Sequence, residues 1–186
     1  MFMATASNQS DWKKTLLLTS LPRWDDLPDI DIYMDQLVTL VERYTATLRV
    51  DSGDTKIITP SMVNNYVKLK LIPAPQKKKY CRTQLARLIV ITILKQVFDI
   101  PSIKAGIEFQ VSLSDSKTAY NYFCEHIEQT IHFFIGSRDE EIQLEDLRSD
   151  FTPIQMACTT LVAKLITEKE LQALLQQKTD DGERSS

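Results

Sequence analysis

The chain has 186 residues, of which 43% are hydrophobic and 25% charged, an ordinary balance for a soluble globular protein. No run approaches the roughly 20 apolar residues of a membrane span, and the N-terminus lacks the apolar core of a signal peptide, so we expect a cytoplasmic protein without a membrane segment. Only 4 glycines are present, which disfavours hairpin-rich folds and favours helices. The 3 cysteines are typical of reduced thiols.

Charge is distributed unevenly along the chain. The stretch 56–104 contains ten basic residues and one acid, a net charge of about +9, whereas the whole chain carries −3. The remainder is therefore strongly acidic. This separation indicates one face suited to a polyanion, carried on an acidic body. The alternative is a solvated basic helix surface without a ligand.

The first element expected is an N-terminal extended arm, residues 1–29. Its start is polar, two prolines then interrupt any helix, and Trp24 is a candidate anchor. Asp29 or Asp31 is expected to cap the helix that follows, because acids stabilise helix N-termini. Apolar residues recur at i, i+4 and i+8 in that helix, which we expect to end near Leu48.

A second, short helix is expected to begin at Thr59-Pro60. The threonine hydroxyl can cap the helix, and a proline at the first helical position loses no hydrogen bond. The helix should run to about Lys70. Its polar side chains follow the spacing i, i+3, i+4, i+7 and therefore share one face: Ser61, Asn64, Asn65 and Lys68.

A proline- and lysine-rich stretch, residues 71–80, follows this helix. Its two prolines forbid helix and suit extended chain, so it predicts a small β-hairpin or a wing-like loop. Residues 82–98 are apolar almost all round and predict a helix at the centre of the core. Pro101 is expected to begin a further short helix, which ends near Val111.

The second half of the chain is also predicted to be helical. One helix is expected from Asp115 or Ser116 to about Gly136, followed by an acidic loop over 138–149. Thr152-Pro153 repeats the cap-and-proline start and begins a leucine-rich helix. The last nine residues are polar and are expected to be disordered.

The predicted order is that of a helix-turn-helix followed by a wing, in which the second helix enters the major groove. Asparagine can bond adenine and lysine can bond guanine, so we assign Asn64, Asn65 and Lys68 to base edges. A solvated polar face is the alternative for the two asparagines. The other candidate DNA-binding residues are expected mainly at phosphates: Thr59, Ser61, Lys77, Lys78, Lys79, Tyr80 and Arg82.

The run from Ile58 to Ile107 resembles the winged helix of MerR-type regulators. The matching pieces are Tyr66, Leu71-Ile72-Pro73-Ala74-Pro75, Lys77 to Tyr80, and Leu85-Ala86-Arg87-Leu88. From about Leu21 to Leu175 the chain resembles a bacterial family of cytoplasmic proteins known only as a domain of unknown function with a MerR-like winged helix. Asn64-Asn65-Tyr66 stands where MerR proteins have Arg-Tyr-Tyr, and Lys70 replaces their usual glycine.

We therefore predict an all-α protein with a small β-hairpin wing. Its parts are an N-terminal arm at 1–29, a MerR-like winged helix-turn-helix domain at 30–111, a helical extension at 112–177 and a disordered tail at 178–186. The predicted function is binding of double-stranded DNA in bacterial transcription regulation. The alternative is a protein–protein interaction module on a winged-helix scaffold, with no DNA binding.

Operators are usually read by dimers, so the leucine-rich helix 153–177 is the candidate homodimer interface, although its leucines could equally belong to the core. Phosphate-loop, dinucleotide-binding and nucleophile-elbow motifs are absent from the sequence. His126 and His132 are spaced to lie on different faces of one helix. We therefore expect no enzyme activity, no cofactor and no metal.

Overall fold

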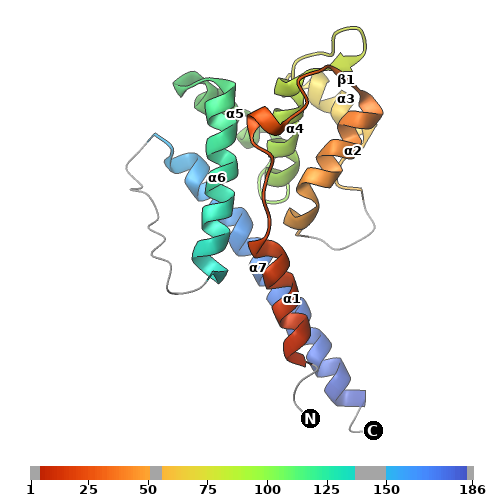
Figure 1. The fold of residues 1–186 in the computed structure, drawn as a ribbon, viewed down its shortest axis with the longest axis vertical. Helices are drawn as coiled ribbons and strands as arrows, with labels where there is room; N and C mark the ends of the chain where they lie inside the picture. The colour runs from red at the N-terminus through yellow and green to blue at the C-terminus, as the bar shows by residue number, and fades with distance from the viewer. Residues whose placement is uncertain (1–4, 51–55, 137–149, 184–186) are drawn as a thin grey trace.

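A computed structural model describes residues 5–50, 56–136 and 150–183 of the chain. This part contains seven α-helices and one two-stranded sheet, so the mostly helical fold is confirmed (Figure 1). The helices are α1 (Thr5–Leu17), α2 (Met34–Thr45), α3 (Pro60–Lys68), α4 (Arg82–Leu94), α5 (Ile100–Leu113), α6 (Ser116–Ile135) and α7 (Thr152–Glu183). The strands are β1 (Ile32–Tyr33) and β2 (Lys79–Tyr80).

Three helices begin at side-chain caps, but the expected cap of α2 by Asp29 or Asp31 is wrong, because Tyr33 is the residue that precedes this helix. The Thr59 hydroxyl accepts a hydrogen bond from the Met62 amide at 3.2 Å, as expected for the start of α3. Asp99 accepts from the Ser102 amide at 2.7 Å at the start of α5, and Asp115 caps α6 in the same way. These hydrogen bonds to the ionised carboxylates lower the pKa of both aspartates.

Helix α4 lies at the centre of the molecule, as predicted. Nine of its 13 side chains are buried, and it lies between α2 and α3 on one side and α5 and α6 on the other (Figure 1). A single cluster of buried apolar side chains extends from Leu37 of α2 through Leu88 of α4 to Phe123 of α6 and Leu161 of α7. The predicted domain 30–111 and the predicted extension 112–177 therefore share one hydrophobic core.

The two ends of the chain differ from the prediction. Helix α1 occupies part of the expected extended arm, and α7 continues to Glu183 through most of the expected disordered tail; residues 184–186 lie outside the described part. The two helices run side by side and project from the body (Figure 1). Lys13 of α1 pairs with Glu170 of α7 at 2.5 Å, and Leu16 is buried in the core. Packing of α1 against α6 and α7 supplies the burial that its polar sequence does not suggest.

Residues 18–31 cross the surface of α6 and are fastened to it. Arg23 forms a two-pronged ion pair with Glu128, at 2.8 and 2.6 Å. The Glu128 hydrogen bonds raise the pKa of Arg23. The Trp24 amide donates to Asn121 Oδ1 at 2.8 Å, and the Trp24 ring meets the Tyr120 ring edge to face at 6.3 Å. Trp24 is therefore an anchor, as expected, and residues 18–31 form a strap that is fastened to α6.

Candidate nucleic-acid interface

Helix α3 is held by one face and exposes the other. Val63 and Tyr66 are buried, and burial raises the pKa of the Tyr66 hydroxyl. Because those two side chains point inward, the opposite face points to solvent. All four polar side chains expected on that face are exposed: Ser61, Asn64, Asn65 and Lys68. The capping residue Thr59 is half-buried, and its hydroxyl already accepts the hydrogen bond from the Met62 amide.

Helix α3 ends in a Schellman motif with a lysine at the position that usually holds glycine. The Leu71 amide donates to the Tyr66 carbonyl at 2.9 Å, and the Lys70 amide donates to the Val67 carbonyl at 3.0 Å. This geometry places Lys70 in the left-handed backbone region, with φ of 56°. A side chain there clashes with its own backbone, so glycine would be the more stable choice.

The turn between Gln76 and Lys79, at the tip of the segment expected to form a wing, is a second place where lysine occupies left-handed backbone. Gln76 and Lys79 exchange backbone hydrogen bonds of 3.0 and 2.8 Å, which close a two-residue turn. The turn residues Lys77 and Lys78 have φ of 48° and 64°. Two successive positive φ angles are the mark of a type I′ turn, which strongly favours Asn-Gly. All three lysines at positive φ are exposed, and they are the only non-glycine residues with positive φ in the described part.

The base of the wing is fastened to the body at two points. Strand β2 pairs antiparallel with β1, so that Ile32 lies opposite Tyr80. Gln84 of α4 accepts a hydrogen bond from the Cys81 amide at 2.6 Å and donates to the Pro73 carbonyl at 2.9 Å. The expected β-hairpin wing is reduced to a tight turn between Gln76 and Lys79, and β2 pairs with β1 from the N-terminal half of the chain rather than with a neighbouring strand.

The exposed lysines around α3 and the wing have no ion-pair partner among the described residues. None of them lies within 4 Å of a described carboxylate: Lys56, Lys68, Lys70, Lys77 and Lys78. Lys79 is half-buried, with its ammonium 5.1 Å from the centre of the Tyr33 ring. Unpaired, exposed lysines keep their full charge available to an anionic ligand.

Two of the predicted DNA-binding residues are engaged inside the protein. Tyr80 is only 3% exposed because its ring belongs to the core, so it offers almost no surface, and we leave it out of the interface. Arg82 donates to the Pro28 carbonyl at 3.3 Å and lies 3.9 Å from the Asp25 carboxylate. Its guanidinium thus faces the acidic strap segment.

Sequence reasoning placed neither Lys70 nor Lys104 at the interface. Lys104 of α5 donates to the Leu69 carbonyl at 3.4 Å and so reaches the end of α3. The signal for Lys70 was the replacement of glycine at the end of a helix, which implies positive φ. Lys95 differs from both, since it is half-buried, donates to the Ile57 carbonyl, and has its pKa lowered by burial.

Comparison with known proteins gives one match. The profile of a family described as a domain of unknown function (DUF1836) matches residues 22–123. The chain belongs to this family. The matched range contains residues 22–31 of the strap, α2, α3, the turn at 76–79, α4, α5 and the first part of α6. Searches of curated proteins and of solved structures found no match.

Two structural findings bear on other kinds of site. Within residues 5–50, 56–136 and 150–183, no helix has the length and apolar character needed to cross a membrane. The same residues contain no group of three or more His, Cys, Asp or Glu side chains arranged to hold a metal ion.

Proposed function

We propose that this chain binds double-stranded DNA through a MerR-like winged helix-turn-helix and regulates transcription in a bacterium. In this proposal α3 lies in the major groove and the wing lies along the adjacent backbone. Asn64, Asn65 and Lys68 would face base edges. The phosphates would be bound by Lys70, Lys77 and Lys78, together with Ser61 at the start of α3.

The observation that carries the proposal is the use of lysine at three left-handed backbone positions. An L-residue in this region costs about 1 kcal/mol or more relative to glycine. Lys70, Lys77 and Lys78 have no ion-pair partner among the described residues that would repay this cost. What lysine supplies in place of glycine or asparagine is positive charge on a fixed surface. Backbone strain retained at exposed cationic positions favours a function that uses the charge, and a polyanion is the ligand that does so.

The salt dependence of duplex binding tests this proposal. With about four phosphate contacts, the logarithm of affinity should fall with a slope of about −3.6 against the logarithm of salt concentration. Between 50 and 200 mM salt this corresponds to roughly a 100-fold loss of affinity for a random duplex. Fluorescence anisotropy across that range measures both quantities. Absence of binding at the lowest salt would contradict the proposal and favour the alternative, an interaction module for an acidic protein surface.

We place the dimer interface of the proposed regulator on the projecting part of α7. Leu171, Leu174 and Leu175 are 51–57% exposed there, which is unusual for three neighbouring leucines of one helix.

Replacing Leu171, Leu174 and Leu175 by glutamine should convert a dimer into a monomer, measured by light scattering after gel filtration. Leu113→Gln on α5 is the matched control, because Leu113 is 42% exposed and lies outside α7, and it should leave the dimer intact. A wild-type protein that remains monomeric at high micromolar concentration would contradict this interface.

A further inference from the structure

The residue that follows the last turn of α3 is an exposed leucine. Leu69 is 46% exposed and lies outside the core cluster. The aliphatic side chains in the interior of the helix pack within or against that cluster: Met62, Val63 and Val67. A single exposed leucine is common on protein surfaces, so exposure alone assigns no role to Leu69. Its position on α3 and its neighbours are what distinguish it.

The end of α3 does not require a leucine at position 69. A Schellman motif is usually accompanied by a hydrophobic contact between the third-last helical residue and the second residue after the cap, which here are Tyr66 and Leu71. Both of these side chains are buried. Leu69 is the cap residue itself and takes no part in that contact. Neither the core nor the helix end therefore accounts for an apolar side chain at this position.

Leu69 borders the exposed polar face of α3. It lies one turn beyond Asn65, and side chains at this spacing are neighbours, with about 5–6 Å between their Cβ atoms. Lys68 and Lys70 flank it in the sequence, and both are exposed without an ion-pair partner among the described residues. The partner that covers Leu69 must therefore be anionic and must also present an apolar group.

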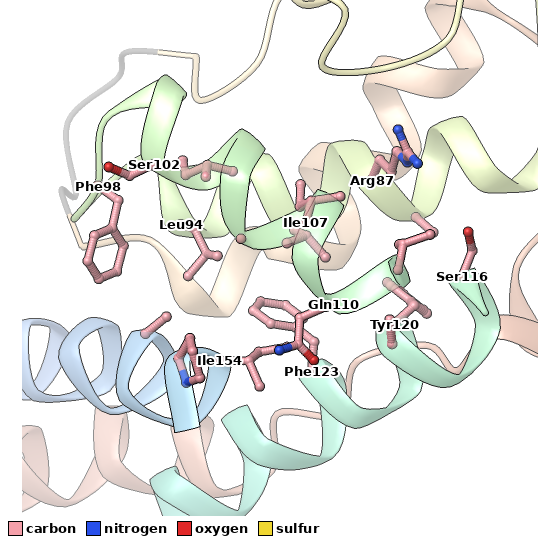
Figure 2. A pocket seen from close by; sticks show the side chains of 18 of the residues that line it. Arg87, Leu94, Phe98, Ser102, Ile107, Gln110, Ser116, Tyr120, Phe123 and Ile154 are labelled. Atoms are coloured by element: carbon pink, nitrogen blue, oxygen red, sulfur yellow. The ribbon is translucent and has the colours of Figure 1, made fainter. Parts of the chain in front are cut away.

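The backbone around Leu69 is held from two helices. Lys104 of α5 donates to the Leu69 carbonyl at 3.4 Å, and Arg87 of α4 donates to the Leu71 carbonyl at 3.5 Å. Figure 2 shows Arg87 at the edge of a cavity of about 340 Å³ among α4, α5, α6 and α7, with its guanidinium pointing away from Gln110. Leu69 thus projects from a helix end that is fastened to the body of the protein.

The major groove of duplex DNA combines an anionic rim with apolar groups. Phosphates border the groove, and thymine presents its C5-methyl group there. Asparagine bonds the N6/N7 edge of adenine, and the base paired with that adenine is a thymine. Neighbouring base pairs are about 3.4 Å apart along the duplex, so side chains one helical turn apart can reach the same or the next base pair.

We propose that Leu69 contacts the C5-methyl group of a thymine in the major groove, at or next to the base pair whose adenine is bound by Asn65. This inference rests on the proposed function, because it requires α3 to lie in that groove. Leu69 is then a specificity-determining residue, whereas the neighbouring lysines supply affinity for the phosphates.

Replacing thymine by uracil tests this contact, because it removes the methyl group and keeps the hydrogen bonds of the base pair. The tightest-binding duplex is first selected from a random library with the wild-type protein, and each of its thymines is then replaced by uracil in turn. At least one replacement should weaken binding roughly fourfold, the effect of one buried methyl group, as measured by fluorescence anisotropy.

The outcomes separate this inference from the function on which it rests. If no thymine is sensitive to replacement, or if selection enriches no sequence, Leu69 reads no base and the inference is wrong, while salt-dependent duplex binding still supports the proposed function. If no duplex binds at the lowest salt, the proposed function fails and the inference fails with it.

Variants at position 69 identify the side chain that reads the methyl group. Leu69→Ala should bind the thymine and uracil duplexes equally, with the wild-type salt slope because no phosphate contact is lost. Leu69→Met keeps a long apolar side chain and should retain the preference for thymine. Leu113→Ala is the matched control, since Leu113 is 42% exposed on α5, and it should behave as the wild type does. A Leu69→Ala protein that still distinguished thymine from uracil would overturn the proposal.

An anionic membrane surface also attracts lysines and takes up leucine side chains. Vesicles that contain phosphatidylserine are therefore the second probe. We expect Leu69→Ala to leave any binding to these vesicles unchanged. Vesicle binding by the wild type that is lost in Leu69→Ala would assign Leu69 to a membrane surface and overturn the proposal.

Discussion

Replacing Lys70 by glycine, Lys77 by asparagine and Lys78 by glycine in one variant is expected to stabilise the protein and weaken DNA binding together. Glycine relieves the strain at the end of α3, and Asn-Gly is the preferred sequence of a type I′ turn. The free energy of unfolding should rise by about 2–3 kcal/mol, at about 1 kcal/mol for each position. The salt slope of duplex binding should become shallower by about 2.7, with affinity at least roughly tenfold lower, because three phosphate contacts are lost.

The opposite signs of the two effects make this variant informative. A substitution that damages the fold would lower both stability and affinity. Because stability is expected to rise in this variant, a loss of DNA affinity could not be attributed to damage to the fold. A charge-matched control replaces three exposed lysines elsewhere, Lys14, Lys117 and Lys178, by glutamine. This control should bind duplex DNA with nearly the wild-type slope. If the stabilised variant bound DNA as tightly as the wild type, the three lysines would have no part in DNA binding, and the proposed interface would be wrong.

Removing the carboxylate of Glu128 is expected to have the largest effect on stability. Glu128 accepts two hydrogen bonds from Arg23 and a third from the Leu21 amide at 2.8 Å. The two side chains of the pair are 19% and 33% exposed. Glu128→Ala leaves the Leu21 amide without a partner and the partly buried Arg23 guanidinium without a counter-ion, with only its hydrogen bond to the Leu21 carbonyl at 2.9 Å, so the free energy of unfolding should fall by about 3 kcal/mol. Urea denaturation measures the loss, and hydrogen exchange should be faster at Leu21 and Trp24.

Asp25→Ala is the matched control, because Asp25 makes two ion pairs that are more open to water. Lys117 lies at 2.7 Å and Arg82 at 3.9 Å, and the Asp25 side chain is 69% exposed. Exposed pairs contribute little, so this substitution should cost about 0.5 kcal/mol or less. Equal losses of unfolding free energy in Glu128→Ala and Asp25→Ala would show that the strap does not depend on the Arg23–Glu128 pair.

Local signals in the sequence were sufficient for much of the fold. The start of α3 follows from Thr59-Pro60, and the central place of α4 follows from a helix that is apolar almost all round. The polar face of α3 was predictable because helical periodicity alone decides which side chains share a face. Helix α1 was missed because burial of Leu16 against other helices, rather than local preference, stabilises it.

The strained lysines and the cavity depended on information that periodicity does not contain. Lys77-Lys78 lacks the Asn-Gly sequence that usually marks a type I′ turn. The turn type is recognised only in the structure, from the backbone hydrogen bonds between Gln76 and Lys79 and the two positive φ angles. The cavity forms because Ala86, Gly106 and Ala157, which are distant in the sequence, lie together in space. Which small residues of four helices face one another is a property of packing, and nothing in a single helix indicates it.

The single hydrophobic core has a consequence for how the chain can be divided. The family match ends at Phe123, the eighth residue of the 20-residue helix α6, whereas the buried face of that helix continues through Ile127 and Ile131. That face shares the core with Leu161 and Leu165 of α7. The segment that defines the family is therefore smaller than the cooperative folding unit, and the whole chain should unfold in one two-state transition rather than in two steps.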